Sequence, residues 1–190
     1  MQDWVHPSEI AQDVLLGSHT HVSVGVVFQG LTYEEAGLSV DNAPYTIWQL
    51  LCHMQYWQEK LVKHLRGIEE VSWPERSVYG WVQEKGPTSE EEWSETVVRF
   101  LSTMHEAVEL IETMEVNWSA HLQRELDRKR RQSLSPSTKN LEKDQDRAAV
   151  PSMLQVVCDL GSHTNYHLGQ IVLLRRLLGL WPPPDGGASW

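Results

Sequence analysis

The segment Gly161-Ser162-His163-Thr164-Asn165-Tyr166-His167-Leu168-Gly169-Gln170-Ile171 places two histidines four residues apart in a run with helical apolar spacing. Residues at i and i+4 lie one above the other on a helix, with Cβ atoms roughly 5–6 Å apart. The two histidines share a stripe with apolar residues at spacings of three or four, namely Val156, Leu160, Ile171, Leu174 and Leu178. The segment therefore predicts a helix that turns both histidines toward a core.

Two core-facing histidines one turn apart favour a metal site. A single buried histidine is more often a structural residue whose nitrogens are hydrogen-bonded, but two imidazoles so placed can both reach one ion. The pair lacks the glutamate of the zinc-protease helix, because Thr164 follows His163. A catalytic metal site has about three protein ligands and an open position. We therefore expect a third ligand elsewhere in the chain.

The bulk properties indicate one globular domain over residues 1–190, with a flexible connection at about 124–150 and an irregular tail at 181–190. A formal net charge of −10 argues against general nucleic-acid binding and against docking on anionic membranes. No apolar run approaches the roughly 20 residues that span a bilayer, no secretory signal is visible, and two cysteines are too few for a disulfide framework. We therefore expect a cytoplasmic protein with no nucleic-acid and no membrane partner.

Three more helices are expected before the histidine pair. The first runs from about Ser8 to Gly30, the second opens at Asp41-Asn42-Ala43-Pro44 and ends at Gly67, and the third follows the capping pattern Ser89-Glu90-Glu91-Glu92. The last helix begins after Pro151-Ser152 and reaches Leu178. No strand is convincing, so the pattern predicts an all-α fold, an antiparallel four-helix bundle. Apolar residues on two sides of the first helix predict a homodimer.

A long loop of about 20 residues separates the second and third helices, and Trp73, Tyr79 and Trp81 give it apolar mass. It is interpreted as a lid or pocket wall, or equally as a loop whose aromatic residues pin it to the core. The basic run Arg128-Lys129-Arg130-Arg131 lies in the connection before the last helix. It is short and lacks interleaved aromatic residues, so we interpret it as solvated chain rather than a nucleic-acid site.

His53 is the candidate third ligand, because a bundle builds its sites from side chains on facing helices. It lies at the edge of the apolar stripe of the second helix, three residues after Leu50 and one turn before Trp57. Taken alone, that position favours a half-exposed polar residue over a ligand.

Two segments, Pro44 to His53 and His163 to Gln170, resemble the DinB-like superfamily of DinB/YfiT-like metalloenzymes. The resemblance covers nearly the whole chain and extends to Gly17-Ser18-His19 and to the ending Arg175 to Pro182. It implies that His53, His163 and His167 hold a divalent metal, with zinc or nickel as first choices and iron or manganese as alternatives. One departure is Cys52, where the most similar branch leads us to expect an acidic residue.

Such a site activates a bound water or thiol. Some DinB-like relatives are similar to thiol S-transferases that use a low-molecular-weight thiol such as bacillithiol or mycothiol. The resemblance thus implies a metal-dependent thiol S-transferase or a hydrolase acting on a small-molecule substrate. His19, Tyr166 and Gln170 are candidates to line the pocket or support the ligands, although a structural role is the commoner one for each residue.

Two other functions remain open from the sequence. The chain could be a non-catalytic metal- or ligand-binding stress-response protein, in which case a closed site rather than an accessible pocket is expected. Nucleophilic catalysis by Cys52 or Cys158 is disfavoured, because cysteine is among the most buried residue types and Cys158 does not align with His163 on a helix.

Overall fold

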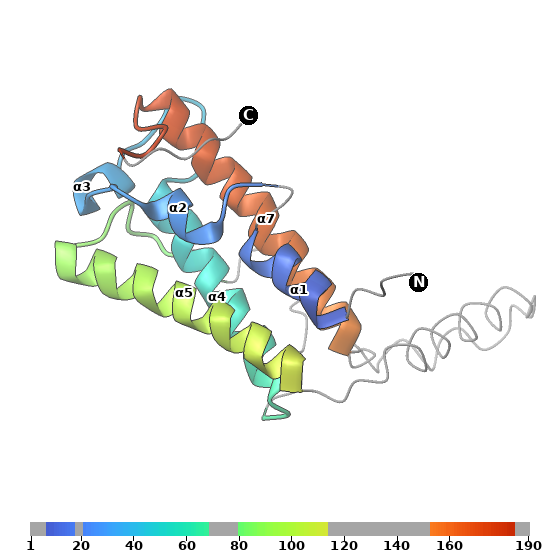
Figure 1. Ribbon diagram of the computed structural model, residues 1–190. Helices are drawn as coiled ribbons and strands as arrows, with labels where there is room; N and C mark the ends of the chain where they lie inside the picture. Colours follow the sequence, from blue (N-terminus) through green and yellow to red (C-terminus); the bar gives the residue numbers. More distant parts are fainter. Residues whose placement is uncertain (1–6, 18–20, 69–79, 114–152, 185–190) are drawn as a thin grey trace, which may run out of the picture.

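The computed structural model describes residues 7–17, 21–68, 80–113 and 153–184. Within these ranges the chain forms helices and no strand, which confirms the predicted all-α class (Figure 1). The helices are α1 (Pro7–Leu16), α2 (Val24–Phe28), α3 (Tyr33–Ala36), α4 (Ile47–Leu65), α5 (Glu90–Thr113) and α7 (Met153–Leu177). None of these described helices is long and apolar enough to cross a membrane.

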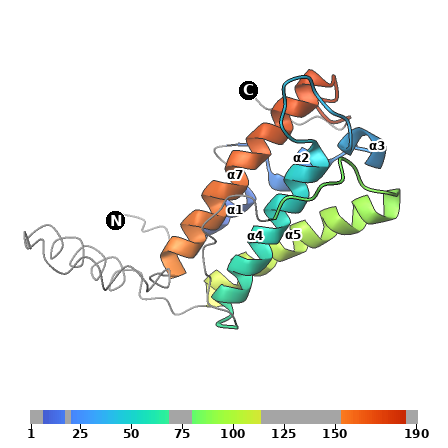
Figure 2. The ribbon, with the colours of Figure 1, turned by 180° about the vertical axis from the view of Figure 1, so that it is seen from behind.

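The long helices lie side by side, with α4 between α5 and α7 (Figure 2). Helix α1 packs against α5 and α7, and the short α2 also contacts both of them (Figure 1). Because α4 and α7 are direct neighbours, side chains that face inward from these two helices can meet.

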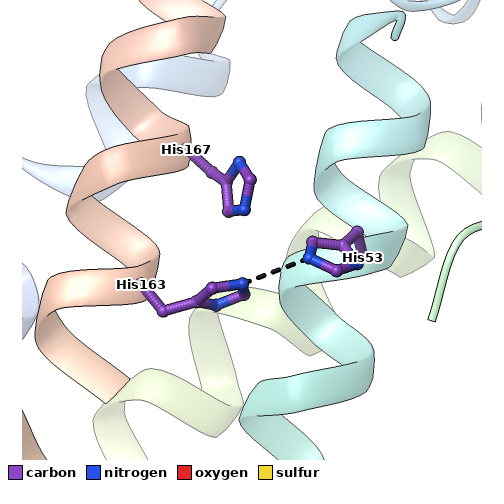
Figure 3. A group of neighbouring side chains, drawn as sticks. All are labelled: His53, His163 and His167. Carbon is purple, nitrogen blue, oxygen red and sulfur yellow. Dashed lines mark hydrogen bonds between the residues drawn. The ribbon is translucent and has the colours of Figure 1, made fainter. Parts of the chain in front are cut away.

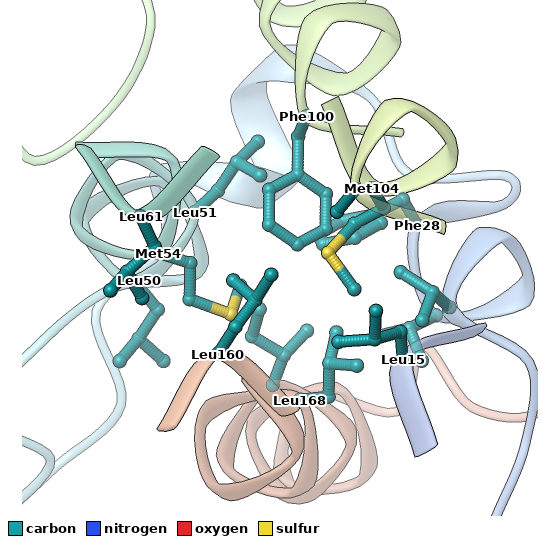
Figure 4. Close-up of a cluster of buried hydrophobic side chains, with 14 of the residues drawn as sticks. Leu15, Phe28, Leu50, Leu51, Met54, Leu61, Phe100, Met104, Leu160 and Leu168 are labelled. Atoms are coloured by element: carbon teal, nitrogen blue, oxygen red, sulfur yellow. The ribbon is translucent and has the colours of Figure 1, made fainter. Parts of the chain in front are cut away.

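Large apolar side chains fill the space between the helices (Figure 4). Phe100 of α5 meets Phe28 of α2 edge to face, with ring centroids 5.5 Å apart. The indole Nε1 of Trp93 donates to the carbonyl of Leu31 at 3.0 Å, so its polar atom is satisfied inside the core. Each fully buried large apolar side chain contributes about 1.5–3 kcal/mol, so this core holds the site-bearing helices in place.

The prediction of one continuous helix from Ser8 to Gly30 is wrong. Helix α1 ends at Leu16, and Gly17 follows with φ +66°, a left-handed conformation that glycine adopts at low cost and that terminates helices. The Gly17 amide donates to the carbonyl of Asp13 at 3.0 Å and closes the last turn. The chain resumes as α2 only at Val24, and the candidate His19 lies outside the described residues.

The second long helix begins later than its predicted start at Asp41 to Pro44. Thr46 is the N-cap of α4, and its hydroxyl accepts from the Gln49 amide at 3.2 Å while Gln49 Oε1 accepts from the Thr46 amide at 3.1 Å. This reciprocal pair satisfies two amides that a helix start leaves without partners. Asn42, with φ 63°, belongs to the preceding turn instead.

Helix α1 approaches α7 closely at Gly161. A Cβ on Gly161 would lie 2.5 Å from Cγ1 of Val14, so only glycine permits this contact without a shift. One turn later, Asn165 Nδ2 donates to the carbonyl of Val14 at 2.9 Å. These contacts fix α1 against the face of α7 that carries Asn165, leaving the histidine face for α4.

Arg175, near the end of α7, is buried although it carries a charge. Its side chain is 1% exposed, and desolvation lowers its pKa. The guanidinium donates to the carbonyls of Val27 at 2.7 Å, Gln29 at 2.9 Å and Leu180 at 3.1 Å. Arg175 therefore joins the end of α2 to the turn that follows α7.

Candidate metal centre

Three histidines from two neighbouring helices converge in the structure: His53 from α4, and His163 and His167 from α7 (Figure 3). One nitrogen of each ring lies within 4.8 Å of those of the other two, and the Nε2 atoms of His53 and His163 are 3.2 Å apart. A tetrahedral ion with ligand bonds of about 2.0–2.1 Å sets its ligand nitrogens about 3.4 Å apart. The observed separation fits such an ion, and the group could hold one.

His53 is buried, with 6% of its surface exposed, so the expectation of a half-exposed residue from helix position alone is wrong. The reason is tertiary: α4 packs directly on α7, which places the edge of its apolar stripe opposite His163 and His167.

Gln170 determines which nitrogen of His167 is free. Its Oε1 atom lies 2.6 Å from Nδ1 of His167. Because an amide oxygen only accepts, Nδ1 carries the proton and Nε2 keeps the lone pair that a metal needs. Gln170 Nε2 also reaches the hydroxyl of Tyr166 at 3.4 Å. The sequence candidate Gln170 thus supports a candidate ligand, and Tyr166 lies beside it.

An aromatic stack holds the ring of His53. The indole of Trp81 lies parallel to this imidazole, with centroids 3.8 Å apart and planes 7° apart. Tyr45 stacks on the same indole at 3.6 Å and 9°. A stacked imidazole has little freedom to tilt, so the stack orients a candidate ligand. Of the three loop aromatics, Trp81 forms part of the site, whereas Trp73 and Tyr79 lie outside the described residues.

The start of α4 anchors the segment that carries Trp81. The Thr46 hydroxyl donates to the carbonyl of Lys85 at 2.6 Å, and Gln49 Nε2 donates to the carbonyl of Val82 at 3.1 Å. The same two side chains form the capping pair of α4. The start of α4 and the segment that carries Trp81 are therefore joined by hydrogen bonds into one unit.

The histidines open onto a cavity of about 710 Å³. The other side chains in its wall include Tyr45, Trp57, Leu61, Trp81, Asp159 and Tyr166. Sequence reasoning missed Asp159, although the same i, i+4 spacing extended backward from His163 reaches it. The site thus combines a small polar cluster with a largely apolar wall, the usual composition of a small-molecule pocket.

Burial keeps the cluster uncharged at neutral pH. Desolvation, followed by the neighbouring histidines, lowers the pKa of His53 to about 4. Desolvation and then His167 lower the pKa of His163 to about 4 as well, and desolvation also lowers the pKa of His167. Neutral imidazole is the form that binds metal, so the lowered pKa values keep the three rings in the metal-binding form at neutral pH.

These pKa shifts predict an acid-sensitive metal-free protein. Unfolded histidines take up protons near pH 6.5, whereas folded His53 and His163 do so near pH 4. As the pH falls from about 6.5 to 4, the unfolded state binds more protons, so folding stability present above pH 6.5 is progressively lost. We expect chemical denaturation in chelator to show this loss over that window. A His53→Gln/His163→Gln variant should lose less stability over the same window. If the free energy of unfolding fell equally steeply with pH in both proteins, the lowered histidine pKa values would be contradicted.

The cysteines do not form part of the site. Burial, followed by Glu92 and Glu84, raises the pKa of Cys52 to about 12, so it stays a thiol at neutral pH. Cys158 is exposed, contrary to the expectation of burial, and among the described residues that line the cavity there is no cysteine. Nucleophilic catalysis by cysteine gains no support from this arrangement.

Comparison of the chain with protein-family models, curated proteins and solved structures finds no match. The DinB-like resemblance therefore stays a prediction from the sequence.

Proposed function

We propose that this protein is a DinB-like, three-histidine metalloprotein built as an antiparallel four-helix bundle. The packing of α4 between α5 and α7, with α1 on α5 and α7, supports the bundle. The observation that carries the functional proposal is that His53, His163 and His167 converge on one point in the wall of a cavity.

The donor set favours particular ions. Three imidazoles suit zinc and nickel, while the oxygen-preferring manganese is a poorer match and iron stays an alternative. When bound, the ion supplies a Lewis acid that lowers the pKa of a water or thiol. Gln170 keeps the proton of His167 on Nδ1, and Trp81 orients His53, so both side chains prepare ligands before the ion arrives.

The proposed reaction is thiol S-transfer to a small electrophile, or hydrolysis of a small molecule. Trp57 and Leu61 give the cavity an apolar wall that favours an organic substrate over water. The non-catalytic alternative predicts a closed site with four protein ligands. Within the described part of the chain the clustered ligand set has three members and faces the cavity, which favours the catalytic proposal.

The proposal is tested with zinc- or nickel-loaded protein, 2-mercaptoethanol and 1-chloro-2,4-dinitrobenzene, with p-nitrophenyl acetate as the hydrolysis probe. We expect one of the two rates to exceed that of the same free metal concentration by about tenfold or more. The His163→Ala variant, folded by circular dichroism, should lose the excess. Equal rates for both proteins would refute catalysis at this site.

A further inference from the structure

Asp159 is the one charged side chain among the described residues that line the cavity, since the three histidines are neutral. It lies one turn before His163 on the same face of α7. Its side chain is half-buried, and desolvation raises its pKa. A carboxylate has thus been placed in a mostly apolar wall, beside the point where the histidines converge.

The Asp159 carboxylate forms no hydrogen bond or ion pair with any other described residue. The apolar side chains of Trp57 and Leu61 line the same cavity. A carboxylate in an apolar wall is partly desolvated, and its raised pKa reflects that cost. The same placement favours a ligand whose positive group would pair with the carboxylate.

We propose that the thiol used at this site carries an ammonium group, and that Asp159 binds this group. This inference rests on the proposed thiol chemistry. The helical rise of 1.5 Å per residue separates Asp159 from His163 by about 6 Å along α7. That distance suits an aminothiol whose nitrogen and sulfur are separated by two to four carbons. The ligand's carbon chain would then lie along Trp57 and Leu61.

The charge of the ion makes Asp159 decisive for this ligand. A divalent cation held by three neutral histidines repels an ammonium group, so a thiol whose nitrogen stays positively charged gains from that charge only if a carboxylate offsets the repulsion. A general-base role for Asp159 would instead affect thiols of every charge alike. Discrimination between charged and neutral thiols therefore separates the binding role from a proton-transfer role.

The test compares thiocholine, whose quaternary ammonium stays positively charged and cannot coordinate nickel, with 2-mercaptoethanol by calorimetric titration into nickel-loaded full-length protein. The measured quantity is the ratio of the two Kd values; comparing this ratio between wild type and variant cancels the difference in intrinsic thiol acidity. We expect the Asp159→Asn variant to reduce the preference for thiocholine by about five- to tenfold. Asp159→Glu should retain most of the preference, and Glu95→Gln, at an exposed position of α5, should leave it unchanged. Nickel stoichiometry and circular dichroism establish that each variant is folded and loaded.

The outcomes are distinct. If both thiols bind wild type but the ratio does not change in Asp159→Asn, the ammonium subsite is refuted and the thiol proposal stands. If neither thiol binds the loaded protein, the thiol proposal itself fails and the aminothiol inference fails with it. Higher salt should also reduce the wild-type preference, because a half-exposed ion pair is screened.

Discussion

Replacing His163 with alanine is expected to weaken nickel or zinc binding by at least about 100-fold. Removing groups that merely support a ligand typically costs 10- to 100-fold in metal affinity, and His163 contributes a nitrogen 3.2 Å from that of His53. His53→Ala and His167→Ala should have similar effects, since each of the three rings contributes one nitrogen to the same cluster. Equilibrium dialysis with metal analysis of untagged protein measures the stoichiometry and the Kd.

Two further variants, one neutral control and one intermediate case, show whether the loss of metal affinity is specific to the three ligands. His105→Ala removes an exposed histidine of α5 and should leave one metal per chain with unchanged affinity. Gln170→Leu leaves all three rings in place but removes the acceptor at Nδ1 of His167, so a 10- to 100-fold loss is expected. A wild-type protein without bound metal under saturating conditions, or a His163→Ala variant that binds as tightly as wild type, would refute the metal centre.

The parts of the site that could be predicted are those encoded by local periodicity. A spacing of four on an apolar stripe is enough to bring His163 and His167 to one helix face. His53 is different, because its helix position alone indicates a half-exposed residue. Only the packing of α4 on α7 makes it a partner of the other two, and the family resemblance was needed to anticipate it.

The missed features depend on contacts distant in sequence. Trp81 reaches His53 because two side chains at the start of α4 bind its loop, a pairing that no periodicity reveals. The break after α1 depends on one glycine with a left-handed φ, and a glycine inside an apolar pattern is compatible with either a helix or its end. Arg175 lies near a helix end, where solvent exposure is usual, so its burial could not be predicted without its carbonyl partners.

Replacing Arg175 with methionine is expected to lower the free energy of unfolding by about 3–5 kcal/mol. The variant removes the donors for the carbonyls of Val27, Gln29 and Leu180, and each carbonyl left unpaired in the interior costs about 1–3 kcal/mol. Relief of the desolvated charge offsets part of that cost. For a chain of this length the melting temperature should fall by about 10 °C.

Arg176→Met is the matched control, because it removes the same charge from the next residue of the same helix at an exposed position. A surface change of this kind usually alters stability by less than about 0.5 kcal/mol. Arg175→Lys should fall between the two, since one ammonium cannot reproduce the planar fork that serves three carbonyls. Urea denaturation of the three variants gives the comparison. Equal losses of stability in Arg175→Met and Arg176→Met would contradict the structural role of Arg175.

The hydrogen bonds of Arg175 lie at the C-terminal end of α7, away from the histidines, so any variant that remains folded should bind metal like wild type. Weakened metal binding in folded Arg175→Lys would instead mean that the anchor at the end of α7 also sets the register of His163 and His167 against α4.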